Sequence, residues 1–239
     1  MTRGVAVQAF GPCPPVGTRL NAWMMRTPLL RWVLVVTLGE AVGFTVPAAV
    51  AVTAQSWGPV ATLVAVVLAG SVEGALLGIA QADCLYRWGA LPVRRRWVAA
   101  TSVGAAVAWS LGMMPSTLGG LNWTAWTAVV VGSGGLILLT SLPLAQYFVL
   151  RNHVRRPALW IPINMVAWLL GIAWTLAPSP WVDQSTPTGA LILIYGIAGL
   201  CMAATVAVVT GVGIIGLLPP PIEIGAHGKR SSSRSKRYA

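Results

Sequence analysis

The chain has 239 residues, of which 56% are hydrophobic and only 9% are charged. A soluble domain carries about 25% charged residues, so this composition excludes a water-exposed globular surface and requires lipid around much of the protein. A formal net charge of +11 would suit a nucleic-acid-binding protein, but the placement of the cations along the chain excludes that class.

Six apolar runs are long enough to cross a bilayer, which takes about 20 residues. In chain order they cover residues 32–54, 60–86, 97–114, 123–150, 159–177 and 188–218. We therefore predict an all-α, polytopic membrane bundle of six transmembrane helices. Around it we expect three parts of the chain: a partly disordered cytoplasmic segment at 1–27, the membrane domain at 28–218, and a basic, disordered cytoplasmic tail at 219–239.

The sixteen basic residues occur only at alternate connections. They precede the first span, lie between spans two and three and between spans four and five, and follow the sixth: Arg3, Arg19, Arg26, Arg31, Arg87, Arg94, Arg95, Arg96, Arg151, Arg155, Arg156, Lys229, Arg230, Arg234, Lys236 and Arg237. The positive-inside rule then predicts cytoplasmic termini in a bacterial inner membrane. We expect the basic loops and tail to contact anionic lipid.

Tryptophans gather near both expected boundaries. The cytoplasmic boundary has Trp23, Trp32, Trp88, Trp97 and Trp160, and the outer boundary has Trp57, Trp123, Trp126 and Trp181. Belts of this kind place indole rings at headgroup level. We therefore expect these tryptophans to anchor the protein in the headgroup region.

Two segments of similar pattern predict an internal repeat. "AQADCLYRWGALPVRRRW" begins at Ala80 and "AQYFVLRNHVRRPALW" begins at Ala145, so that Gln81 aligns with Gln146 and Trp97 with Trp160. Trp32 fits the same position in the first span. We predict three tandem helical hairpins, with Gln81 and Gln146 hydrogen-bonded across the interface between repeats.

The repeat also resembles that of a protein family. The motif G-x-x-Q-x-x-x-L reads "GIAQADCL" at Gly78–Leu85, and "PLAQYFVL" at 143–150 is a version that lacks the glycine. With the basic loop and tryptophan that follow, it resembles small bacterial, actinobacterial-like integral membrane proteins of six helices. The resemblance implies a fold of helical hairpins and no particular activity.

Two glutamates interrupt the apolar spans. At about 1.5 Å of rise per residue, Glu40 lies roughly 13 Å and Glu73 roughly 20 Å from the cytoplasmic ends of their helices, and no Lys, Arg or His shares any span with them. An ionised carboxylate at this depth costs about 2.5–3.5 kcal/mol, so we expect at least one acid to hold a proton. The pair is the candidate proton or ligand site.

Small residues accompany both acids. Gly39 and Gly43 flank Glu40, and Gly70, Gly74 and Gly78 form a stripe beside Glu73. Glycines at four-residue spacing let helix backbones approach closely, so we expect these five positions, together with Gln81 and Gln146, to be helix-packing sites.

No motif for catalysis, metal binding or cofactor binding is present. The histidines lie outside the spans, and Cys13, Cys84 and Cys201 have no metal-ligand spacing. The sequence favours a non-enzymatic, transport-related or small-molecule-binding membrane protein centred on Glu40 and Glu73. One alternative is an accessory subunit that packs its glycines against another membrane protein or a second copy of itself. A second alternative is an intramembrane enzyme that uses the two acids.

Overall fold

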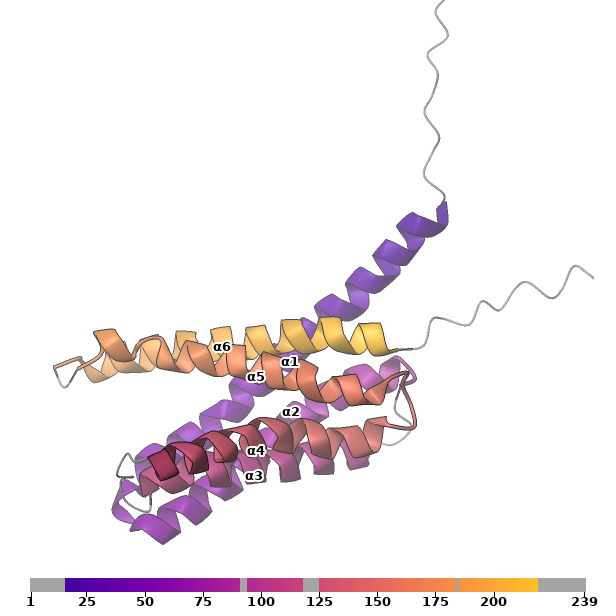
Figure 1. Ribbon diagram of the computed structural model, residues 1–239. Helices are drawn as coiled ribbons and strands as arrows, with labels where there is room; N and C mark the ends of the chain where they lie inside the picture. Colours follow the sequence, from indigo (N-terminus) through magenta and orange to yellow (C-terminus); the bar gives the residue numbers. More distant parts are fainter. Residues whose placement is uncertain (1–15, 91–93, 118–124, 184, 219–239) are drawn as a thin grey trace, which may run out of the picture.

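The computed structural model describes residues 16–90, 94–117, 125–183 and 185–218, and the secondary structure in these ranges is helical (Figure 1). Six helices there are long and apolar enough to cross a membrane. The six long helices are α1 (Val16–Thr53), α2 (Pro59–Arg87), α3 (Arg94–Thr117), α4 (Ala125–Leu150), α5 (Trp160–Leu176) and α6 (Thr188–Leu217). The prediction of an all-α bundle of six transmembrane helices is confirmed, and the protein is a multi-pass integral membrane protein.

The largest difference from the predicted boundaries is at the start of α1. This helix begins at Val16, although the sequence predicted a partly disordered segment as far as residue 27. The additional turns extend away from the other helices (Figure 1, indigo). Residues 1–15 and the tail at 219–239 lie outside the described residues, so the predicted disorder there remains a prediction.

The six helices form a closed ring. Each helix contacts the next one in the chain, and α6 returns to contact α1. The contact between α4 and α5 is the least extensive in the ring. A ring of this kind has one interior shared by all six helices, which brings together residues far apart in the sequence.

The outer face of the ring is apolar. Leucine, valine and isoleucine side chains are more than half exposed along the helices, for example Leu38 on α1, Val103 on α3 and Ile192 on α6. The interior is more polar: Glu40, Glu73, Gln81, Thr101, Gln146, Asn164 and Thr210 are all buried. This distribution is expected of a protein whose solvent is the lipid tail, because exposed apolar side chains cost nothing there.

One end of the bundle carries an ion-pair cluster, and we call it the arginine end. Asp83 on α2 accepts from Arg31 of α1 at 2.9 Å and from Arg87 of its own helix at 3.0 Å. Arg94 at the start of α3 lies 3.5 Å from the same carboxylate. The cluster joins three helices at the end where the sequence predicts the cytoplasm.

Candidate functional site

The interior of the ring contains a cavity of about 490 Å³. All six helices contribute to its wall, from Glu40 and Phe44 on α1 to Met202 on α6. A volume of this size is within the range of about 300–1,000 Å³ found for small-molecule sites. The cavity is therefore large enough to hold an organic molecule.

Glu40 lies on α1 and lines the cavity. Its side chain has 0% solvent exposure, and no backbone, amide, indole or hydroxyl donor among the described residues bonds either carboxyl oxygen. Buried polar groups are almost always hydrogen-bonded. A buried acid that no other kind of donor satisfies, at the wall of a cavity, is a candidate for binding a ligand.

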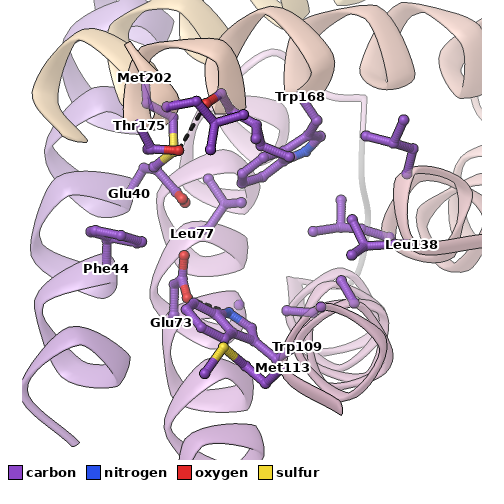
Figure 2. A pocket seen from close by; sticks show the side chains of 18 residues that line it. Glu40, Phe44, Glu73, Leu77, Trp109, Met113, Leu138, Trp168, Thr175 and Met202 are labelled. Carbon is purple, nitrogen blue, oxygen red and sulfur yellow. Dashed lines mark hydrogen bonds between the residues drawn. The ribbon is translucent and has the colours of Figure 1, made fainter. Parts of the chain in front are cut away.

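Glu73 lies on α2, the adjacent helix, and lines the same cavity. Its Oε2 accepts a hydrogen bond of 2.6 Å from the indole N–H of Trp109 on α3. Figure 2 shows the carboxyl groups of Glu40 and Glu73 directed toward one another on one side of the cavity. The two acids predicted as a site from the sequence thus lie together, one with an indole donor and one without.

Three aromatic rings lie in the wall of the cavity. Phe44 and Trp109 lie beside the two acids, with ring centroids 6.4 Å apart, and Trp168 lies further across (Figure 2). The other lining residues are mostly Leu, Met, Ile, Ala and Gly. Within the part of the chain that the structure describes, no Lys, Arg or His lines the cavity, and the two acids are its titratable side chains.

A hydrogen-bonded layer lies between this cavity and the arginine end, and we call it the tryptophan layer. It consists of three fully buried tryptophans, each donating its indole N–H to a polar side chain of another helix. The donor–acceptor pairs are Trp97 Nε1 to Gln81 Oε1 at 3.1 Å, Trp160 Nε1 to Gln146 Oε1 at 2.9 Å, and Trp32 Nε1 to Thr210 Oγ1 at 3.2 Å.

Further hydrogen bonds link the two glutamines in the layer. Gln146 Nε2 donates to Gln81 Oε1 at 2.8 Å and to Thr101 Oγ1 at 2.9 Å. Both glutamines are fully buried. The polar side chains of α2, α3 and α4 therefore form one network at this level of the bundle.

The prediction that these three tryptophans sit in the headgroup region is wrong. Trp32, Trp97 and Trp160 each have 0% solvent exposure and face the interior of the ring. Their indole N–H groups find acceptors inside the bundle, which is where a buried indole must find one. By contrast Trp57 and Trp181, near the opposite ends of their helices, are 58% and 80% exposed, as headgroup anchors would be.

The layer has a regular position relative to the cavity. In each odd helix the first cavity-lining residue comes eight positions after the tryptophan: Glu40 after Trp32, Ala105 after Trp97, and Trp168 after Trp160. Eight residues of helix span roughly 12 Å. The buried layer therefore separates the cavity from the arginine end.

The glycines predicted to mediate packing lie between the chain's own helices. A Cβ on Gly39 would lie 2.6 Å from the Cβ of Ala80, and one on Gly74 would lie 2.5 Å from the Cβ of Ala105. Gly43 faces the backbone of Glu73, Gly70 faces the indole ring of Trp109, and Gly78 faces Val98 and Thr101. A partner subunit would therefore need a surface other than these five glycines.

Sequence reasoning missed Trp109, the residue that holds Glu73. A usable signal was present, because Trp109 lies inside the third apolar run, after Trp97 and before the predicted end of the run at Met114. Gly70 contributes to the same arrangement, since its missing side chain leaves the space that the indole fills. Phe44 and Met202 carry no such signal, because an apolar residue in a membrane helix is expected at any position.

Comparison with known proteins adds no assignment to this geometry. No family model matches the chain, and no curated protein or solved structure is significantly similar to it.

Proposed function

We propose that this protein binds a small molecule in its central cavity, with Glu40 and Glu73 as the recognising groups, and that this binding serves a transport-related role. The observation that carries the proposal is Glu40. Its carboxyl group is fully buried at the wall of a cavity of about 490 Å³, and the polar group beside it is the carboxyl group of Glu73, a second acid (Figure 2). The ligand would provide a partner that is not an acid.

The transport part of the proposal is supported by the position of the cavity. It lies inside a ring of six helices that are long enough to cross a membrane, and the tryptophan layer separates it from the arginine end. Transporters of several folds hold their substrates near the middle of the bilayer. A transporter must have a conformation in which its binding site is closed toward one side of the membrane, and this arrangement fits such a conformation.

The same proposal includes the predicted orientation and repeat. We place the arginine end in the cytoplasm of a bacterial inner membrane, because the cations gather there. The three-hairpin repeat is supported by equivalent contacts, since the aligned residues Gln81 and Gln146 each accept from the tryptophan that begins the following odd helix. Trp32 makes the corresponding bond to Thr210 on α6. The likeness to bacterial six-helix proteins belongs to this proposal too.

Filling the cavity tests the binding site. Ala108 lines it, so Ala108→Phe should occupy part of its volume, whereas Val107→Phe adds the same ring at a neighbouring position that is 41% exposed. Purified protein in lipid nanodiscs would be screened by thermal unfolding against a library of charged and uncharged small molecules. A ligand at 100 times its Kd stabilises a protein by about 2.7 kcal/mol, which gives a measurable rise in Tm.

We expect compounds that stabilise the wild-type protein and the Val107→Phe variant but not the Ala108→Phe variant. Equal stabilisation of all three proteins would refute the cavity as the site. For the transport role, pH-dependent flux into proteoliposomes should be lost in Glu40→Gln and Glu73→Gln, which keep the shape of each side chain but cannot ionise. Unchanged flux in both variants would remove that role.

The accessory-subunit alternative receives less support. Its predicted interface was the set of five glycines beside the acids, and each of these already contacts another helix of the same chain. An enzymatic role for the two acids would convert a bound compound into a chemical product. Neither binding in the screen nor flux in proteoliposomes involves such a conversion, so detection of a product separates this role from binding and transport.

A further inference from the structure

We infer that the ligand of the central cavity is a monovalent organic cation with a hydrophobic, preferably aromatic, body. This inference rests on the proposed function and adds the chemical class of the ligand. It depends on the charge of the cavity, the absence of any other kind of donor to Glu40 among the described residues, and the chemistry of the wall.

The charge of the cavity favours a cation. Glu40 and Glu73 line it, and none of the lining residues is basic. The helices packed against α1 and α2 bring no Lys, Arg or His to this wall either. A buried carboxylate needs an opposite charge or hydrogen-bond donors close to it, so a ligand with a positive charge supplies what the protein does not.

The hydrogen-bonding state of the two acids locates the charge. Trp109 donates one hydrogen bond to Glu73, whereas no indole, amide, hydroxyl or backbone donor among the described residues bonds Glu40. The two carboxyl groups are directed toward one another (Figure 2). A cationic head between them would lie against both acids, with the Glu73 carboxylate already held in place by the indole.

The size and wall of the cavity favour an organic cation over a metal ion. Calcium and magnesium take about six to eight oxygen ligands, and among the described residues no group of three or more His, Cys, Asp and Glu side chains lies close enough to hold a metal. A volume of about 490 Å³ also exceeds the needs of one ion. The rings of Phe44, Trp109 and Trp168 offer faces for cation–π contact, which operates within about 6 Å of a ring centroid.

The number of acids gives the proton stoichiometry. A monovalent cation balances one carboxylate, so the second acid keeps its proton. At a pH where both acids are protonated before binding, the balance is R₄N⁺ + Glu–COOH → R₄N⁺·Glu–COO⁻ + H⁺, with the proton released to solvent. Protons and ligand therefore compete, and affinity for the cation should fall as the pH falls.

The test uses a cation and its uncharged isostere. Benzyltrimethylammonium and neopentylbenzene have the same shape and differ by one positive charge; tetraphenylphosphonium serves as a larger cationic probe. Binding to the full-length protein in nanodiscs would be measured by isothermal titration calorimetry in two buffers of different ionisation enthalpy, which reports proton release. The variants are Glu73→Gln, Ala108→Phe and, as a control for loss of an acid outside the cavity, Asp183→Asn.

At a pH low enough for both acids to be protonated before binding, we expect the wild-type protein and Asp183→Asn to bind at least one cation with release of about one proton per ligand. Both proteins should bind the isostere at least about 30-fold more weakly. Glu73→Gln should weaken the cation about 100-fold and leave the isostere unchanged, while Ala108→Phe should weaken every ligand. Equal binding of cation and isostere would overturn the cationic inference and leave cavity binding standing. Binding of neither cation would overturn the inference, and the library screen would then decide the proposed function separately.

Discussion

Among the described residues of the tryptophan layer, Gln146 makes the most hydrogen bonds to other side chains. Its Nε2 donates to Gln81 and Thr101, and its Oε1 accepts from the indole of Trp160. Replacing it by leucine keeps a similar volume and removes all three bonds. We predict that Gln146→Leu destabilises the folded bundle, and the structure allows the size of the effect to be worked out bond by bond.

The three bonds are not equivalent in cost. Gln81 Oε1 still accepts from Trp97, and the Thr101 hydroxyl still donates to the Trp97 carbonyl. Loss of each of those two bonds should cost about 0.6 kcal/mol, the average for hydrogen bonds between membrane helices. The indole N–H of the fully buried Trp160 loses its acceptor, which costs about 1–3 kcal/mol. We expect a total of about 2–4 kcal/mol.

Steric-trap unfolding in bicelles measures the free energy of unfolding without removing the lipid environment. The control is Thr140→Val on the same helix, because the Thr140 hydroxyl bonds only to carbonyls of its own helix and its loss should stay within about 0.5 kcal/mol. In a Trp160→Phe background the cost of Gln146→Leu should fall by about 1 kcal/mol or more, since no indole N–H is left unpaired. A cost below about 0.5 kcal/mol, or the same cost in both backgrounds, would refute the bond-by-bond reasoning.

Three further predictions concern other parts of the molecule. Gly74→Ala should lower the free energy of unfolding by about 1–3 kcal/mol, because its Cβ would lie 2.8 Å from the Thr101 carbonyl oxygen. The control is Gly134→Ala on α4, where the new Cβ meets nothing within 4 Å and stability should not fall. An equal loss of stability in both variants, measured by steric trapping, would contradict close packing as the cause. Alkaline phosphatase fused after Arg96 should be inactive and after Ser185 active, and the reverse result would invert the proposed orientation. Hydrogen bonds from the Ser185 side chain and backbone hold the pKa of Asp183 below its ordinary value. The stability that these bonds contribute is therefore present at a pH above the ordinary pKa of Asp and is lost as the pH falls through the lowered pKa. Ser185→Ala should raise the pKa of Asp183 in an NMR titration, and an unchanged pKa would contradict the assigned cause.

Much of the helical architecture was readable from the chain because membrane helices obey strong local rules. The predicted spans at 60–86 and 188–218 correspond to α2 at Pro59–Arg87 and α6 at Thr188–Leu217. A backbone inside lipid must satisfy its hydrogen bonds within the segment, so length and apolar composition suffice to find the helix. The start of α1 was missed because residues 16–27 are less apolar and the rule does not apply to them.

The candidate site was only half readable. Glu40 and Glu73 stand out because an acid is costly in lipid, and that cost is a property of one residue in one helix. The position of Trp109, which bonds Glu73, and the cavity wall depend on how α3 to α6 close around α1 and α2. The three boundary tryptophans show the same limit, because a position near a helix end does not say whether the side chain faces headgroups or neighbouring helices.

The amino-acid sequence alone determined that six apolar segments cross a membrane, that the cations gather at one end, and that two acids lie deep inside. These follow from the free energy of placing each residue in lipid or water, which needs no knowledge of the neighbours. Only the tertiary structure decided that the helices close into a ring and that both acids line one cavity. It also decided that Trp109 bonds Glu73 and not Glu40, and that buried tryptophans lie between the cavity and the arginine end. Those features arise from contacts between helices that are distant in the chain, and each contact depends on which side of each helix is turned toward the other.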